Sequence, residues 1–452
     1  MKKILNNNDK IKPLKYKESN LKRKMIIVTI VFSVLIISGM FLYKTFAIFT
    51  EEKHFNVING EVSDPGDIYF AYYIDDKIAR DIPTQDSGYT LDTTKSTCTN
   101  GVAVGWDRIN WTALVNYQKY NATNNTRTKC DLYFTFKPPM VSEYITTLAQ
   151  TDTTNLAVDD YGNTRYIGKD PNNYVTFDGD IWRIIGVMKD IDDGSGNKED
   201  RVKIIRSTSI GNYSWDTCSN LMNGGIRVNE WSQADVMKLL NPGYESESVG
   251  GSLYWNNQSG TCYYLRSNST TSCDFTSTGI KDKLKNMIGN AVWNTGAPTT
   301  SKQIASKWYT EERGTRNGKI CTGGYFCDDA IDRTTTWTGK VGLMYPSDYG
   351  YATSGGSGAD RATCLNTTLD SWDDSSVSDC KNNNWLFDNS TYQLTLTPSA
   401  QSSSAAEVFD LRPSGLVSLA GDYGGVRPVG YLLSNTSIQS GDGSLENPFI
   451  LS

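Results

Sequence analysis

The chain has 452 residues and a net charge of −6 at pH 7, from 44 basic and 50 acidic side chains. This acidic balance argues against nucleic acid as a partner, because phosphate backbones repel negative charge. Only 38% of the residues are hydrophobic, whereas Gly (39) and Tyr (26) are abundant. That composition favours short strands and long polar loops, and the length leaves room for two or three domains.

The first 24 residues carry nine basic side chains and precede an uncharged apolar run, residues 25–43. A run of this length rises about 28 Å as a helix, enough to cross a hydrocarbon core. Lys and Arg mark the cytoplasmic side of a first membrane segment. We therefore expect residues 1–24 to be a cytoplasmic tail and the run from Met25 to Tyr43 to be a signal-anchor that contacts the membrane. The alternative is a signal peptide cleaved after Ala47, which would release a secreted protein.

All nine cysteines follow the apolar run, on the side expected to be extracellular, where disulfides persist. Sequence alone does not determine connectivity, but local spacing favours four pairs. These pairs are Cys98 with Cys130, Cys262 with Cys273, Cys321 with Cys327, and Cys364 with Cys380. Cys218 is left over as a free thiol, and burial is the default expectation. The alternatives are a reactive thiol at the surface and a link between protomers. No Cys-x-x-Cys pair occurs, so no zinc site is expected.

Residues 51–137 are expected to form a small all-β sandwich. Short runs rich in aromatic and β-branched residues alternate with turn-forming sequences, as is typical of strands joined by tight turns. The predicted strands are 55–62, 67–74, 102–106 and 131–137. Trp106 and Trp111 are expected in the core, the Cys98–Cys130 bridge suits a sandwich, and the Lys-Pro-Pro sequence at 137–139 ends the domain as a linker.

Residues 141–452 are expected to form a larger α+β domain. A hairpin is predicted over 173–187, turning at Asp178 and Gly179. Ser232 and Asp235 have the spacing of a capping box, which predicts a helix through Leu240. Further helices are predicted at 141–149 and 282–293, and further strands at 201–206, 339–345, 407–411, 416–419 and 427–432.

Catalytic motifs are scarce in this sequence. The single histidine, His54, lies a few residues beyond the apolar run, where a triad is not expected. Residues 190–200 resemble a calcium loop, but Ser195 stands where an EF-hand requires glycine, so a solvated hairpin loop is favoured over calcium. A glycosidase would need two carboxylates about 5–10 Å apart, and the sequence does not place such a pair. No enzyme, cofactor or metal is therefore expected, and calcium stays an open alternative.

Tyrosines clustered with serine and turn residues give the strongest signal for binding. Rigid aromatic rings beside adaptable hydrogen-bonding groups are typical of recognition surfaces. We expect a binding face formed by loops that carry Tyr349, Tyr351, Ser399, Ser402 and Tyr423. The alternative is that these tyrosines pack the sheet, with only their hydroxyl groups near water.

The C-terminal third resembles a known fold family. Asn-Trp-Leu at 384–386, Val-Phe-Asp-Leu at 408–411 and Gly-Gly-Val-Arg-Pro-Val at 424–429 are similar to the closing strands of the C-type-lectin-like fold of formylglycine-generating enzymes and phage variable tropism proteins. The closest resemblance is to uncharacterised modules in surface proteins of gut Firmicutes, over roughly residues 155–452. It implies a lectin-like α+β domain with disulfides, in which Trp182, Trp385 and Arg427 are structural, Arg427 through several hydrogen bonds.

Two departures from that family limit what the resemblance implies. The calcium motifs of sugar-binding relatives, Glu-Pro-Asn and Trp-Asn-Asp, are absent, and a redox cysteine pair cannot be assigned. Sugar specificity and catalysis therefore do not transfer with the fold. The expected function is that of a membrane-anchored bacterial surface protein with a non-catalytic adhesion head, whose partner is a host or neighbouring-cell protein or glycan. The alternatives are a pilin-like or matrix structural protein and a glycan-acting hydrolase.

Overall fold

The computed structural model describes residues 68–452, except 85–86, 100–103, 108–110, 116–127, 218–228, 266–267, 316–333, 401–407 and 421–422. Several predictions lie outside these described residues: the tail 1–24, the apolar run 25–43, His54, the strand 55–62, Ser402, Cys218 and the pair Cys321–Cys327. No helix within the described ranges is long and apolar enough to span a bilayer. The chain divides into two compact units, Met1–Lys137 and Pro138–Ser452, which we describe separately.

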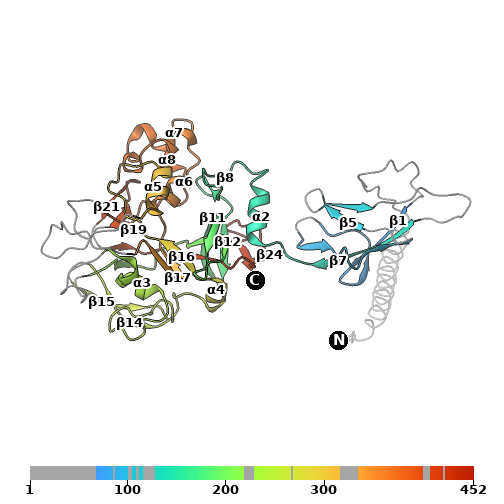
Figure 1. Ribbon diagram of the computed structural model, residues 1–452, viewed down its shortest axis with the longest axis horizontal. Coiled ribbons are helices and arrows are strands. Elements are labelled where there is room, and N and C mark those ends of the chain that lie inside the picture. The colour runs from blue at the N-terminus through green and yellow to red at the C-terminus, as the bar shows by residue number, and fades with distance from the viewer. Residues whose placement is uncertain are drawn as a thin grey trace, which may run out of the picture. The chain divides into compact units, whose positions relative to one another are not determined.

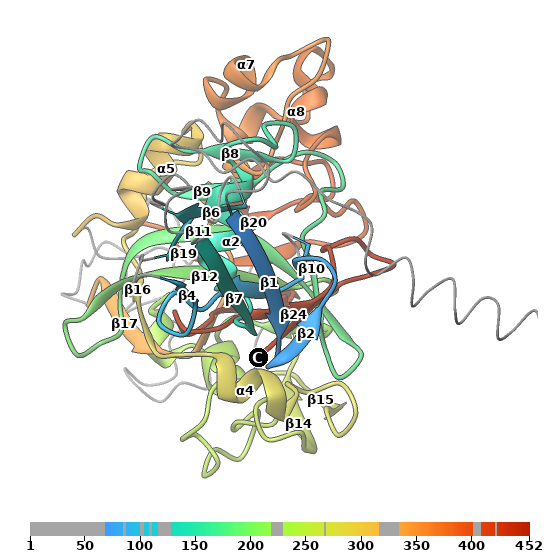
Figure 2. The same cartoon turned by 90° about the vertical axis from the view of Figure 1, so that its right-hand side faces the viewer.

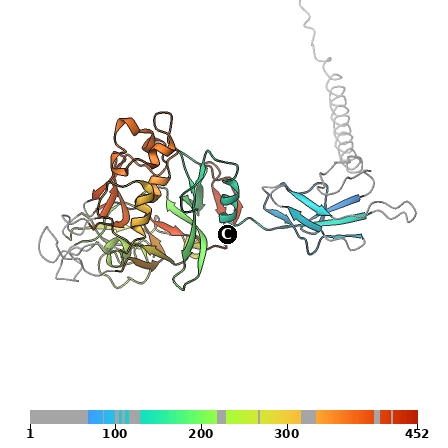
Figure 3. The ribbon, with the colours of Figure 1, turned by 45° about the horizontal axis from the view of Figure 1, so that its top comes forward.

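The first unit contains a five-stranded sheet in which β1 pairs in parallel with β7 and β4 also pairs with β7. Figures 1 and 3 show its strands in blue and cyan. Leu132 and Phe134 alternate with more exposed residues along β7 and form its small core. Trp106 of the separate β5–β6 ribbon contacts Phe134, with ring centroids 5.7 Å apart. The strands are β1 (Ile68–Ile74), β2 (Lys77–Ala79), β3 (Tyr89–Leu91), β4 (Thr97–Cys98), β5 (Val104–Asp107), β6 (Thr112–Val115) and β7 (Thr128–Phe136).

The second unit is built on a nine-stranded sheet with the order β18-β23-β12-β11-β10-β25-β24, and β9, paired with β8, joins β11. The hairpin of β10 and β11 turns at Asp178 and Gly179, whose φ angles of 51° and 85° are those of a tight hairpin turn. The strands are β8 (Leu156–Val158), β9 (Thr164–Tyr166), β10 (Tyr174–Phe177), β11 (Asp180–Asp192), β12 (Lys198–Arg206), β18 (Val341–Gly342), β23 (Val429–Tyr431), β24 (Ile438–Ser440) and β25 (Phe449–Leu451).

A smaller five-stranded sheet with the order β13-β22-β19-β20-β21 completes the framework, together with two ribbons, β14–β15 and β16–β17. Its strands are β13 (Asn212–Ser214), β19 (Gln393–Pro398), β20 (Val408–Leu411), β21 (Val417–Ala420) and β22 (Tyr423–Gly425). The ribbons comprise β14 (Ser259–Tyr263), β15 (Thr270–Asp274), β16 (Ala291–Asn294) and β17 (Thr336–Gly339).

The helices of the second unit are short and lie around these sheets. They are α2 (Val141–Leu148), α3 (Asp235–Leu240), α4 (Asp282–Met287), α5 (Ala305–Glu312), α6 (Pro346–Tyr351), α7 (Arg361–Leu365) and α8 (Asp379–Asn382). Figures 1 and 2 both show α7 and α8 at one end of the unit and the β14–β15 ribbon at the opposite end. Its core is rich in fully buried tryptophans, among them Trp182, Trp215, Trp231, Trp293, Trp308 and Trp372.

The expected fold class, an all-β sandwich followed by a lectin-like α+β domain, is wrong. Of the residues that the structure describes, 36% are in strands and 17% in helices. The parallel pairing of β1 with β7 also differs from a sandwich of two antiparallel sheets. Within the second unit, the helix predicted over 282–293 ends at Met287, because the chain turns and Trp293 pairs with Trp337 across the β16–β17 ribbon.

Two other local expectations differ from the structure. The Ser232 hydroxyl bonds Glu230 instead of capping a helix, and the N-cap of α3 is Ala234 without a side-chain bond. A capping box therefore does not start this helix. The strand expected over 339–345 is reduced to Val341–Gly342, because Pro346 begins helix α6, whose first turn Asp348 caps.

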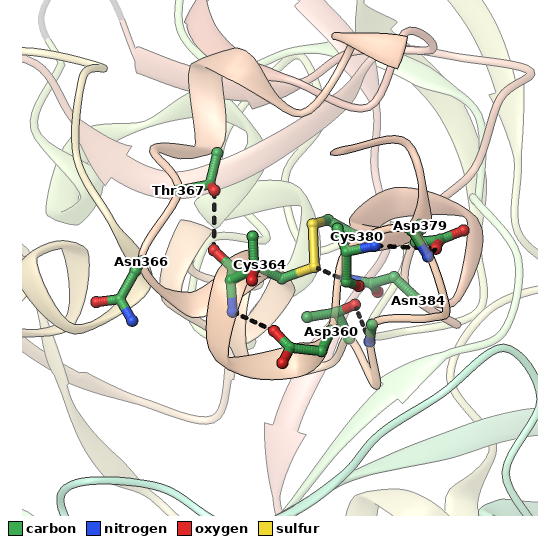
Figure 4. Close-up of a disulfide and its surroundings, with 12 residues drawn as sticks. Asp360, Cys364, Asn366, Thr367, Asp379, Cys380 and Asn384 are labelled. Atoms are coloured by element: carbon green, nitrogen blue, oxygen red, sulfur yellow. Dashed lines mark hydrogen bonds between the residues drawn. A yellow bond between two sulfur atoms is a disulfide. The ribbon is translucent and has the colours of Figure 1, made fainter. Parts of the chain in front are cut away.

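Three disulfides cross-link the described residues: Cys98–Cys130, Cys262–Cys273 and Cys364–Cys380. They are three of the four pairs that local spacing favours. Figure 4 shows the third, which joins α7 to α8, beside Asp360, whose carboxylate accepts the Thr363 amide of α7 at 2.7 Å. Disulfides persist in oxidising compartments, so these bonds indicate an extracellular protein.

Candidate functional site

The predicted binding residues do not form one face. Tyr349 and Tyr351 are buried because α6, which carries them, is buried along its whole length. Tyr349 donates its hydroxyl to the Gly415 carbonyl at 2.8 Å, and Tyr351 donates to Asp160 at 3.2 Å. Ser399 is also buried. An exposed face therefore excludes Tyr349, Tyr351 and Ser399, and Ser402 lies outside the described residues.

Tyr423 is the predicted binding residue that the structure leaves accessible, with 40% of its surface exposed. Its ring meets that of Tyr264 edge to face, with centroids 6.5 Å apart. Tyr423 lies on β22 of the smaller sheet, whereas Tyr264 directly follows β14 of the β14–β15 ribbon, so the two rings come from separate sheets. We call these two residues the tyrosine pair.

The backbone around the tyrosine pair is held at several points. Cys262, two residues before Tyr264, is bonded to Cys273 across the β14–β15 ribbon. Ser214 of β13 pairs with Tyr423 and donates its hydroxyl to the Leu265 carbonyl, which joins the ribbon to the sheet. The backbone that carries the two rings is thus held by a disulfide, a strand pairing and a hydrogen bond.

Tyr392 is a second exposed tyrosine near β22, but it faces the other way. Gln393 pairs with Gly425, so Tyr423, two residues from Gly425, shares the face of Gln393. Tyr392, next to Gln393, projects to the opposite face, where the Arg412 guanidinium lies 6.0 Å from its ring centroid. With 51% exposure, Tyr392 is comparable to Tyr423 in accessibility and independent of the tyrosine pair.

The residues expected to be structural are buried and bonded. Trp182 donates to Asp180 at 2.8 Å, and Trp385 donates to the Tyr166 carbonyl at 2.9 Å. Arg427 donates through Nε to the Arg206 carbonyl at 2.9 Å and through Nη1 to Gln393 at 3.2 Å. The Arg427 side chain therefore connects the end of β12 in the large sheet with β19 in the small sheet.

A buried charge cluster lies between the large sheet and α6. Arg165 of β9 bonds Asp159 through Nε at 2.6 Å and Asp348 through Nη1 at 2.9 Å. The second oxygen of Asp348 accepts Lys203 Nζ of β12 at 2.5 Å. All four side chains are at most 2% exposed. Arg165, Asp159, Asp348 and Lys203 form what we call the charge cluster.

In the charge cluster, burial and the neighbouring charges shift the pKa values of Asp348 and Lys203 in opposite directions. Burial alone would raise the pKa of Asp348, but the charges of Lys203 and Arg165 outweigh it and hold that pKa at about 2. Burial lowers the pKa of Lys203 to about 8, and Asp348 offsets only part of this shift. The cluster is therefore an ion network at neutral pH whose lysine is unusually close to deprotonation.

A third buried carboxylate, Glu312, lies at the end of α5 beside this network. It accepts the Ser347 amide at 2.9 Å and the Ser347 hydroxyl at 2.5 Å, and burial raises its pKa. Its neighbour Arg313 stacks on the Tyr309 ring, 3.4 Å from the centroid. These carboxylates accept hydrogen bonds from fixed protein donors, as in a structural network.

The acidic stretch 190–200 forms the end of the β11–β12 hairpin. Asp192 accepts the Gly194 amide at 2.8 Å, and Asp193 accepts the amide and hydroxyl of Ser195, both at 2.7 Å. The carboxylates thus stabilise the turn itself. Among the residues with described positions, no three His, Cys, Asp or Glu side chains converge as a metal ion would require.

Sequence reasoning missed the charge cluster, because its members are up to 189 residues apart in the chain, from Asp159 to Asp348. One local signal exists: Lys203 stands alone in the apolar run Val-Lys-Ile-Ile of 202–205, where a charge needs a buried partner. Comparison with known proteins adds no further guide, since no family model, no curated protein and no solved structure matches this chain.

Proposed function

We propose that the chain is an extracellular surface protein whose second unit is a non-catalytic binding head. The observation that carries this proposal is the tyrosine pair, in which Tyr423 is exposed and its ring meets the Tyr264 ring edge to face. The ligand is a protein or a glycan of a host or neighbouring cell. Both offer flat or apolar groups to tyrosine rings and polar groups to the surrounding loops.

The support for binding lies in how firmly the rings are held. A recognition surface gains affinity when its groups need little ordering upon binding. The Cys262–Cys273 disulfide and the pairing of Ser214 with Tyr423 hold the backbone that carries both rings before any ligand arrives. The described carboxylates of the charge cluster are committed to internal ion pairs, which favours binding over hydrolysis as the function of this unit.

The chain is proposed to stay attached to the cell through the apolar run 25–43, with residues 1–24 in the cytoplasm. The disulfides agree with the extracellular side for the rest of the chain. Cell fractionation with an antibody against the second unit tests this anchor. Recovery of the full-length chain in the membrane fraction supports it, whereas a soluble chain that starts after Ala47 would establish cleavage.

Binding is tested on glycan and protein arrays with the oxidised chain, with and without calcium. We expect the Tyr423→Ala variant to lose affinity about 5- to 30-fold, corresponding to about 1–2 kcal/mol for one aromatic contact. Tyr392→Ala is the matched control, since Tyr392 is similarly exposed but faces away from the pair. Equal binding by wild type and Tyr423→Ala would remove the tyrosine pair as the site. If the chain binds to nothing on either array, the result would favour a pilin-like or matrix structural role.

A further inference from the structure

The Lys203 amine and the Asp348 carboxyl group are in contact within the core of the second unit. Lys203 Nζ lies 2.5 Å from Asp348 Oδ2, and the two side chains are 1% and 2% exposed. Lys203 belongs to β12 near the centre of the large sheet, whereas Asp348 lies in the first turn of α6, 145 residues later. Folding alone therefore brings an amine and a carboxyl group together, away from bulk water.

Aromatic rings surround the amine of this pair. The Tyr345 ring centroid is 4.2 Å from Lys203 Nζ, and the centroids of Tyr431 and Trp293 are 5.6 Å and 5.7 Å away. Across the described part of the chain, Asp348 is the one hydrogen-bond acceptor that Lys203 Nζ reaches. An ammonium group has three donors, so this charge is poorly solvated and its neutral form is favoured relative to water.

The carboxyl group is held by donors on both oxygens. Arg165 Nη1 donates to Oδ1 at 2.9 Å, and the Tyr345 amide donates to Oδ2 at 2.9 Å, in addition to Lys203. A guanidinium on Oδ1 is in position to stabilise negative charge that develops there when a nucleophile adds to the carboxyl carbon. The fixed geometry replaces the encounter of two separate reactants.

We propose that Lys203 and Asp348 condense in the folded protein to form an intramolecular isopeptide bond. The Lys203 ammonium first passes a proton to Asp348 Oδ2 along their hydrogen bond, which gives a neutral amine and a neutral carboxylic acid. Nζ then adds to the carboxyl carbon, and the charge on Oδ1 is stabilised by Arg165. A second proton moves from Nζ to Oδ2, the bond from carbon to Oδ2 breaks, and one water molecule leaves.

This reaction needs no oxidant, cofactor or second protein, since the ion pair converts to an amide and water with no net transfer of protons. It also removes two buried charges from the core, which relieves their desolvation. The bond would clamp β12 to α6 across a sequence separation of 145 residues, far more than the 16 residues between Cys364 and Cys380. The inference is independent of the binding role of the tyrosine pair.

Peptide mass mapping of the purified full chain tests this bond. After reduction, alkylation and trypsin digestion, an unlinked chain releases peptide 341–361 and is cut after Lys203. The linked chain instead gives peptide 202–206 joined to peptide 341–361, with a mass one water molecule below their sum. We expect the linked species to predominate, and fragment ions to place the bond on Lys203 and Asp348.

Controls separate the link from failure to fold. Lys203→Arg retains the positive charge but not the amine, so it should give peptide 341–361 unlinked. Arg165→Lys should slow link formation after refolding, while native near-ultraviolet circular dichroism shows that the core has formed. Wild-type protein that is natively folded and gives cleavage after Lys203 with free peptide 341–361 would overturn the proposal, whatever the variants do.

Discussion

Replacing Arg165 with Met should destabilise the second unit by about 3–5 kcal/mol at pH 7. Arg165 makes two charge-assisted hydrogen bonds, to Asp159 at 2.6 Å and to Asp348 at 2.9 Å. Each such bond contributes about 1.5–3 kcal/mol, and removal of one partner from a buried ion network costs about 3–5 kcal/mol. Met fills part of the arginine volume, so the loss reports mainly on charge and hydrogen bonding.

The loss should also depend on pH in a defined direction. Arg165 and Lys203 hold the folded pKa of Asp348 at about 2, below the unfolded value of about 3.9. A lowered folded pKa gives stability that is present above the unfolded pKa and is lost as pH falls through the folded pKa. Because the variant lacks the Arg165 part of this stabilisation, the difference between variant and wild type should be smaller at pH 3 than at pH 7.

Urea unfolding followed by tryptophan fluorescence measures this loss, because many tryptophans of the second unit are buried. Samples are compared at the same state of the Lys203–Asp348 pair, established by peptide mass. Asp159→Asn added to Arg165→Met should recover part of the stability, since it removes the orphaned charge. A loss below about 1 kcal/mol that is equal at both pH values would refute the reasoning and show that water reaches the cluster.

Two further predictions concern the remaining parts of the second unit. Replacing both Cys364 and Cys380 with Ala should lower the unfolding free energy by about 3 kcal/mol, as expected from loop closure over a separation of 16 residues; an unchanged urea midpoint would contradict this. Burial raises the pKa of Asp410 to about 7, with Arg412 lowering it only in part. Stability should therefore fall between about pH 4 and pH 7, on the order of 2–4 kcal/mol, and Asp410→Asn should flatten that slope. A slope as steep in the variant as in wild type would assign it to another group, such as Asp235, whose pKa burial also raises.

Local chemistry allowed some elements to be predicted from the sequence. The turn at Asp178 and Gly179 was predictable because both residues tolerate positive φ angles, and strand-forming residues flank them. The Cys262–Cys273 disulfide was predictable because a short polar loop lies between the two cysteines. In such cases, the structure of the segment is determined by residues that are close together in the sequence.

The candidate site depended on contacts that no local pattern reveals. The sequence Tyr-Pro-Ser-Asp-Tyr-Gly-Tyr at 345–351 has the composition of an exposed loop, yet it forms α6 inside the core. The decisive partner of Tyr349 is the Gly415 carbonyl, which lies 66 residues away. Tyr423 has a similar local composition but stays exposed, because only Tyr264 of the described rings covers it. Composition thus identified tyrosine-rich segments, and tertiary packing decided which of them face water.

The parallel pairing of β10 with β25 has a consequence for folding. One edge of β10 pairs with β11, which follows it directly in the chain, but its other edge pairs with β25, where Val175 lies opposite Phe449. This edge of β10 therefore cannot be covered until the whole chain between the two strands has been synthesised, and pairing over such a sequence separation is slow. Until then β10 has an open edge, which is a template for aggregation, and deletion of β25 would make that edge permanent.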